Sequence, residues 1–182
     1  MRLWPLALLI LQASAAFGQS TSVQKSIEMP AHRGLLSTMN ADGVDLLPFT
    51  TDGCSGGMSW SWRLVSDMFP DFEASQGAEP PWENCCVVHD RAYHNAGGAT
   101  SAEDSYAERL AADEALRLCV VAQGEDEVAR LAVQYEVSEE RVRQAYGMIG
   151  DAMFNAVRLG GAPCSVLPWR WGYGYPLCLP EF

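Results

Sequence analysis

Apolar residues recur at helical spacing in several stretches of this 182-residue chain. The clearest stretch follows Ser138, a residue type that caps helix N-termini. Apolar or small residues recur there every three or four positions, at Val142, Ala145, Ile149, Ala152, Met153 and Ala156. A second helix is predicted from about residue 100 to residue 121, because Thr100 and Glu103 have the spacing of a capping box. A weaker helical pattern covers residues 128–135.

Proline and glycine mark the ends of the helices predicted upstream. Pro81 suits the first turn of a helix that ends at about His94, before two glycines. A short helix is predicted over residues 60–69, ahead of the next proline. Residues 19–47 show no sustained period, and we expect an irregular arm with a short helix near Leu35. The pattern as a whole predicts an all-α fold.

The first 18 residues have the layout of a secretory signal peptide. Arg2 gives a positive start, residues 3–11 form an apolar run broken by one proline, and small residues lead up to Gly18. This run is too short to span a bilayer, and no later run approaches the ~18 apolar residues that a membrane helix needs. We expect cleavage after Gly18, with Ala15 or Ala16 as alternatives, and a secreted or periplasmic mature protein without a transmembrane segment.

Composition favours one folded domain with extensions. Hydrophobic residues make up 48% of the chain and charged residues 19%, which is typical of globular proteins. A length of 182 residues suits one domain with a core of its own. The predicted organisation is a signal peptide (1–18), an N-terminal arm (19–47) and one mostly helical domain (48–182).

The formal net charge of -11 restricts the partners that the chain can bind. A strongly acidic protein is repelled by nucleic acid, and this sequence has no polybasic segment for anionic lipid headgroups. Neutral, zwitterionic or cationic partners are therefore expected, and a bound divalent cation would be compatible with the charge.

The mature chain keeps six cysteines, at positions 54, 85, 86, 119, 164 and 178. An even number of cysteines in an exported protein indicates disulfides. Six cysteines allow 15 different connectivities, so the count alone leaves the pairing open.

The segment with the most chemistry lies on the helix that begins near Pro81. Cys85, His89 and Tyr93 follow one another at intervals of four, so they share one face of that helix. Asp90 lies on the neighbouring face, together with the second cysteine of the pair. One helix thus presents an imidazole, a carboxylate and a phenol.

The run Cys-Cys-x-x-His-Asp-x-x-Tyr resembles the active-site helix of secreted phospholipases A2. The resemblance implies that His89 is the general base and that Asp90 is a ligand of Ca²⁺. It also implies that Tyr93 holds a second aspartate on an antiparallel helix, six residues before a cysteine. Asp113 stands six residues before Cys119. Asp113 would then fix the tautomer of the histidine ring.

The same resemblance implies the fold and the disulfides. Two antiparallel helices and a calcium-binding loop would form the core of residues 48–182, with additional helices around them. The implied disulfides are Cys54–Cys86, Cys85–Cys119 and, for the two cysteines that remain, Cys164–Cys178. The family usually has one more disulfide between the two helices, and both of its positions are alanine here, Ala92 and Ala112.

The implied calcium-binding loop is the glycine-rich segment 52–57. Ca²⁺ takes oxygen ligands, including backbone carbonyls and carboxylates. The resemblance assigns the carbonyls of Gly53, Ser55 and Gly57 to the ion, together with the carboxylate of Asp90. This loop departs from the commonest pattern of the family, and the chain between it and the cysteine pair is longer than usual.

The implied activity is calcium-dependent hydrolysis of a phospholipid acyl ester at the sn-2 position, on a membrane or micelle surface. Water activated by His89 would be the nucleophile. An alternative is a non-catalytic module that keeps the scaffold and binds lipid or protein with calcium. A third is an exported structural protein whose cysteines only mimic the pattern. A zinc site is disfavoured, because no second Cys or His pair completes four ligands at the usual spacing.

The tail after Gly160 is predicted to be a loop rich in aromatic residues. Four of them alternate: Trp169, Trp171, Tyr173 and Tyr175. On an extended strand they would share one side. Two interpretations stay open, a surface that contacts lipid or a disulfide-tethered tail that covers the core.

Overall fold

The computed structural model describes the backbone of residues 5–54 and 58–182, with side chains in these ranges from residue 22 onward except residue 72. Its helices are α1 (Pro5–Met39), α2 (Met58–Met68), α3 (Pro70–Gln76), α4 (Glu83–His94), the short 3-10 helix η1 (Ala96–Gly98), α5 (Ala102–Gln134) and α6 (Glu139–Gly160). No strand occurs in the described ranges, so the predicted all-α fold is confirmed.

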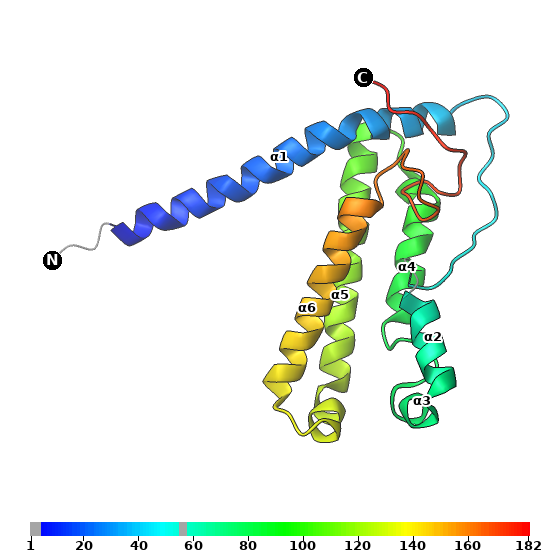
Figure 1. Cartoon of the computed structure of the whole chain (residues 1–182). Helices are drawn as coiled ribbons and strands as arrows, with labels where there is room; N and C mark the ends of the chain where they lie inside the picture. The colour runs from blue at the N-terminus through cyan, green and yellow to red at the C-terminus, as the bar shows by residue number, and fades with distance from the viewer. Residues whose placement is uncertain (1–4, 55–57) are drawn as a thin grey trace.

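The α5 and α6 helices form a long pair at the centre of the molecule (Figure 1). Arg117 of α5 pairs with Asp151 of α6, and Glu125 pairs with Arg143, so the two helices run antiparallel. The α4 helix also packs against α5, and the second half of α1 crosses the start of α5. Four helices therefore converge near one end of the central pair.

The α5 and α6 helices approach closely at Gly124. A Cβ atom at Gly124 would lie 2.4 Å from Cγ of Tyr146, whereas a Cβ at Gly147 would meet no neighbouring atom within 4 Å. We expect Gly124→Ala to lower the free energy of unfolding by about 1–3 kcal/mol, because overpacking outweighs the gain in helix propensity. Gly147→Ala, the matched control, should raise it by up to about 1 kcal/mol. Urea unfolding measures both, and stabilisation by both substitutions would contradict the close approach.

Two boundaries of the long helices differ from the prediction. Ser101, rather than Thr100, caps α5, because its side chain accepts a hydrogen bond from a backbone amide of the first turn. The α5 helix also continues to Gln134, so that residues 128–135 are its last part and not a separate element. Apolar side chains of that part pack into the core against α6, which explains the continuation. Ser138 caps α6, as predicted.

The predicted irregular arm, residues 19–47, is helical as far as Met39. Its serines and its proline disfavour a helix locally, which is why no period was apparent. Glu28, His32 and Leu35 follow at helical spacing and are all buried. Packing of this face against α5 and the C-terminal tail stabilises the helix more than propensity does.

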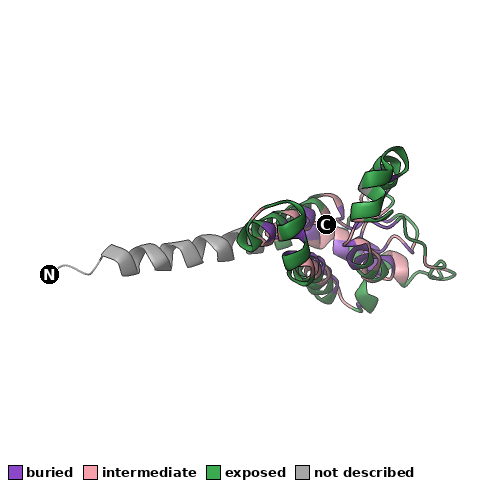
Figure 2. Ribbon diagram, turned by 90° about the horizontal axis from the view of Figure 1, so that it is seen from below, coloured by how far each residue is buried: buried purple, intermediate pink, exposed green. Residues whose placement is uncertain are grey.

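The α2 and α3 helices form a small unit beside the central pair. The α2 helix lies close to the predicted residues 60–69. Pro70 does more than end it, because it occupies the first turn of α3, which was not predicted. In Figure 2 this unit is mostly coloured as exposed and stands away from the rest of the molecule.

The core consists of two apolar clusters. One lies between α4, α5 and α6 and includes Leu116 and Met153. The other joins α1, α4 and the tail through Leu35 and Trp171. His89 lies on α4 between the residues that this helix contributes to the two clusters.

Candidate active site

The α4 helix brings His89 and Tyr93 against Asp113 of α5. His89 Nε2 lies 2.9 Å from Asp113 Oδ1, and the Tyr93 hydroxyl donates to the same oxygen at 2.7 Å. The disulfide Cys85–Cys119, at the N-terminal end of α4, sets the register of the two helices. Because a carboxylate only accepts hydrogen bonds, the ring proton lies on Nε2. Nδ1 is therefore the atom of His89 that could take up a proton.

The second oxygen of Asp113 belongs to a buried charge cluster, formed by Glu28, Arg109, Asp113 and Arg158. Arg158 donates to Asp113 Oδ2 at 3.0 Å and to Glu28 Oε1 at 2.8 Å. Arg109 donates to the other oxygen of Glu28. None of the four residues is more than 8% exposed. Two positive and two negative charges balance, as buried charges require.

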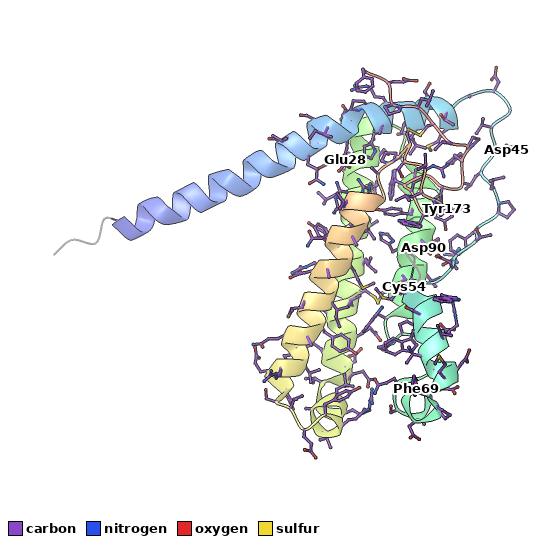
Figure 3. The ribbon with its side chains drawn as sticks, viewed as in Figure 1. Glu28, Asp45, Cys54, Phe69, Asp90 and Tyr173 are labelled. Atoms are coloured by element: carbon purple, nitrogen blue, oxygen red, sulfur yellow. A yellow bond between two sulfur atoms is a disulfide. The ribbon has the colours of Figure 1, made fainter. Side chains whose placement is uncertain are left out.

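Arg109 connects this cluster to the end of α6. Its Nε donates to the Tyr93 hydroxyl at 3.2 Å, and its Nη2 donates to the carbonyls of Val157 and Arg158, both at 2.8 Å. These carbonyls belong to the last turn of α6, where the carbonyl of Val157 also accepts a hydrogen bond from the amide of Gly161. Figure 3 shows Glu28 where α1 passes over the ends of α5 and α6. The cluster thus ties four helices together behind Asp113.

Sequence reasoning missed Glu28, Arg109 and Arg158. The only local signal was the spacing of Arg109 and Asp113, which stand four apart on one helix. Glu28 and Arg158 are 130 positions apart in the chain, beyond the reach of any helical spacing rule.

The surroundings of His89 favour its protonated form. Burial lowers the pKa of the ring, but the hydrogen bond to Asp113 and the negative charges of Asp113 and Asp90 raise it by more. The pKa therefore lies above the ordinary value of 6.5. Such an environment stabilises the charged ring that forms when a general base accepts a proton.

The neighbours of Glu28 hold its pKa well below the ordinary value. Burial alone would raise its pKa, but His32, Arg109 and Arg158 lower it from 4.5 to about 2. A depressed carboxyl pKa adds stability that is present above the unfolded-state value and is lost as the pH falls towards the folded-state value. Glu28 should therefore stabilise the fold at neutral pH, and this contribution should be lost between pH 4.5 and pH 2.

We expect Glu28→Gln to lower the free energy of unfolding at pH 7, and the difference from the wild type to shrink below pH 4.5. Chemical denaturation at pH 7, 4.5, 3 and 2 measures this difference. Asp151→Asn, which alters an exposed ion pair with Arg117, is the matched control and should change stability little throughout. A difference for Glu28→Gln that stays constant down to pH 2 would contradict the assignment.

A largely apolar cleft of about 450 Å³ opens beside His89 and Asp90. Its walls come from the start of α2, from α4, α5 and α6, and from the tail. The remaining lining residues are Cys54, Met58, Trp82, Cys86, Leu116, Ile149, Ala152, Met153, Ala156, Val157 and Trp169. A cleft of this volume and character can hold part of an aliphatic chain against the histidine.

The apolar stripe of α6 is divided between core and cleft. Val142 and Met153 are buried, as expected for a stripe that packs inward. Ala152 and Ala156 are exposed and line the cleft. Ala145 is exposed as well and does not line the cleft, so this position of the stripe belongs to neither.

Asp90 faces a second hollow, of about 240 Å³, next to the cleft. The hydroxyl of Thr51 donates to Asp90 Oδ2 at 2.5 Å, and the other carboxylate oxygen lies 3.8 Å from His89 Nδ1. Asp52 and Thr50 also line the hollow. Hydroxyl and carboxylate oxygens suit a hard cation such as Ca²⁺. Among the described side chains, no three of His, Cys, Asp or Glu cluster to hold a metal.

The predicted calcium loop is described only at its start. Gly53 is buried with a φ of 78°, and a Cβ there would collide with the carboxylate of Glu83. Ser59 ties that carboxylate to the loop, donating to it at 2.5 Å and accepting from the amide of Cys54 at 2.7 Å. Ser55 and Gly57, the other two predicted carbonyl ligands, lie outside the described residues.

The aromatic tail adopts turns, so its four rings do not share one side of a strand. Trp171 is fully buried, stacks edge-on against Tyr93 and donates from its indole nitrogen to Ser105 at 2.9 Å. Trp169 lines the cleft, and the hydroxyl of Tyr173 donates to the carbonyl of Thr50. The tail therefore covers the core at Trp171 and borders the site at Trp169.

The six cysteines form the disulfides Cys54–Cys86, Cys85–Cys119 and Cys164–Cys178, the pairs that the resemblance implies. In the part of the chain that the structure describes, no helix is long and apolar enough to cross a membrane. Comparison with known proteins finds no matching family model, no matching curated protein and no matching solved structure. An activity for this chain must therefore be inferred from the geometry of the site itself.

Proposed function

We propose that this protein is a calcium-dependent hydrolase of phospholipid acyl esters, acting at the sn-2 position as secreted phospholipases A2 do. One observation carries the proposal. A histidine whose Nε2 is bound to a buried aspartate stands in the wall of an apolar cleft, beside a carboxylate in a hollow that Thr51 and Asp52 also line. The cleft suits an acyl chain, and the histidine suits a general base.

In the proposed reaction, Nδ1 of His89 takes a proton from a water molecule, whose oxygen attacks the ester carbonyl carbon. Asp113 stabilises the imidazolium that forms and keeps the ring in one tautomer. When the ester bond breaks, His89 returns the proton to the alkoxide oxygen of the leaving lysophospholipid. Ester and water become fatty acid and lysophospholipid, and the histidine is restored.

Asp90 would hold the calcium ion, with oxygen atoms of the preceding loop. A bound calcium ion polarises the ester carbonyl and stabilises the negative charge that develops on its oxygen. Thr51 orients the carboxylate of Asp90 through its hydrogen bond. Gly53, Ser55 and Gly57 are the proposed sources of backbone carbonyl ligands.

The test is fatty-acid release from vesicles of sn-2-labelled phosphatidylcholine or phosphatidylglycerol by the oxidised mature protein. We expect release with calcium, and none with chelator or with His89→Gln. Calcium binding without release from either lipid would favour the non-catalytic module. Neither calcium binding nor release would favour a structural role for the disulfide-bonded scaffold.

The role of Asp90 can be tested separately from that of the base. We expect Asp90→Asn to raise the calcium concentration for half-maximal activity by roughly tenfold or more, because calcium affinity depends on the charge of its ligands. Calorimetric titration with calcium should show the same weakening. Asp126→Asn, an exposed site on α5, is the control and should leave both measurements unchanged. Equal calcium affinity in both variants would place the ion elsewhere.

A further inference from the structure

The α2 helix buries two serines and exposes several large apolar residues. Its buried residues are two serines, Ser59 and Ser66. Ser66 donates to the carbonyl of Gly77 at 3.1 Å, and Ser59 joins the start of the loop to α4. Met58 and Trp62 of α2 are partly buried against the core. Five other large apolar side chains, on α2 and just after it, are exposed: Trp60, Leu64, Val65, Met68 and Phe69.

These five residues, here called the α2 stripe, form one continuous surface. Trp60, Leu64 and Met68 follow at intervals of four, so they share a face of the helix. Trp60 is 66% exposed and Met68 62%. Figure 3 places Phe69 at the junction of α2 and α3, away from the central helices. Surface helices normally turn such a face inward, so a contiguous exposed one indicates a binding surface.

The α2 helix borders the cleft through residues on the face opposite the α2 stripe. Met58, at the first position of α2, lines the cleft. Trp62 stacks edge-on against Trp82, which also lines the cleft, with ring centroids 5.9 Å apart. The disulfide Cys54–Cys86 anchors the chain just before α2 to α4. The helix that carries the α2 stripe on its exposed face therefore borders the cleft with its buried face.

The charges around the α2 stripe select among possible partners. Arg63 is paired with Glu79, while Asp67, Asp71 and Glu73 add negative charge beside the apolar side chains. An acidic border repels anionic headgroups and an identical acidic border of a second copy. Tryptophan favours the boundary between water and lipid, and an amphipathic helix can lie in that boundary with its apolar face inserted.

We propose that the α2 stripe docks this protein onto lipid surfaces with zwitterionic headgroups. This inference rests on the proposed function and adds the surface through which the substrate layer is reached. Trp62, Ser59 and the Cys54–Cys86 disulfide join α2, which carries the stripe, to α4, which lines the cleft.

The test measures binding and hydrolysis separately. Partition onto phosphatidylcholine vesicles is followed by flotation in the His89→Gln background, so that the lipid is not consumed. We expect the double variant Trp60→Ser, Met68→Ser to lose roughly tenfold or more in partition. The matched control is Leu179→Ser, Phe182→Ser, which removes two exposed apolar side chains from the C-terminal tail and should partition like the parent.

In active protein, the α2 double variant should hydrolyse a short-chain phosphatidylcholine below its micellar concentration at an unchanged rate, while losing activity on vesicles.

Undiminished partition of the α2 variant would overturn the inference, and so would equal losses in the control pair. Stronger binding to phosphatidylglycerol vesicles than to phosphatidylcholine would overturn the headgroup assignment. A dimer that only the α2 variant abolishes would assign the stripe to a second copy. Partition that depends on α2 without any hydrolysis would uphold the docking surface and remove the proposed function.

Discussion

Replacing His89 with glutamine should lower kcat for fatty-acid release by roughly 10²- to 10⁴-fold, the contribution of a well-placed general base. Glutamine can keep a hydrogen bond to Asp113, but it cannot accept a proton from water at neutral pH. The cleft keeps its other lining residues, so KM should change far less than kcat. Steady-state kinetics with saturating calcium measures both constants.

His94 provides a matched control on the same helix. It is also buried, but its ring packs edge-on against Phe49 and Tyr173 instead of contacting Asp113. We expect His94→Gln to leave kcat nearly unchanged once the folded fraction is verified by circular dichroism. Equal losses in the His89 and His94 variants would indicate damage to α4 and not removal of a base.

Asp113→Asn separates the charge of the aspartate from its position. The amide can still occupy the same space beside Tyr93 and His89, but it no longer stabilises a protonated ring. We expect kcat to fall by at least about 100-fold. Calcium affinity should change little, because Asp113 lies on α5 behind the ring and does not line the hollow that Asp90 faces. Normal activity in this variant would show that the charge of Asp113 does not assist His89.

Local spacing was sufficient to predict the first part of the site. His89 and Tyr93 are four apart on a helix, so their meeting needed only helical geometry. Asp113 needed one long-range constraint as well, and the cysteines on the two helices provided it. The resemblance placed Asp113 six residues before Cys119, and the disulfide Cys85–Cys119 brings the carboxylate to the ring.

Other features depend on which face of a helix is buried, and spacing alone does not determine that. The α2 helix was predicted, but two of its serines, Ser59 and Ser66, are buried, while Trp60, Leu64 and Met68 are exposed. The sequence predicts an irregular arm over residues 19–47, whereas the chain is helical as far as Met39. The packing partners of this helix lie in α5 and the tail, about 70 to 150 positions later, so no local pattern indicates them. Glu28 could not be assigned to the site for the same reason.

Arg158→Met should lower the free energy of unfolding by about 3–5 kcal/mol, because it leaves buried carboxylates without their counter-ion. Arg158 is 7% exposed and bridges Asp113 and Glu28. Methionine fills much of the same space, so the expected loss is mainly electrostatic. Arg117→Met, which breaks the exposed pair with Asp151, is the matched control and should cost about 0–1 kcal/mol.

The double variant Glu28→Gln, Arg158→Met distinguishes charge balance from simple loss of contacts. Each single change leaves the buried charge cluster with one unbalanced charge, whereas the double change removes one charge of each sign. If balance governs the stability of the cluster, the double variant should be more stable than the sum of the single effects predicts, by about 1–3 kcal/mol. Additive losses in urea unfolding would mean that the two side chains act independently. A positive coupling would show that α1 and α6, 130 positions apart in the chain, stabilise each other through the charges behind Asp113.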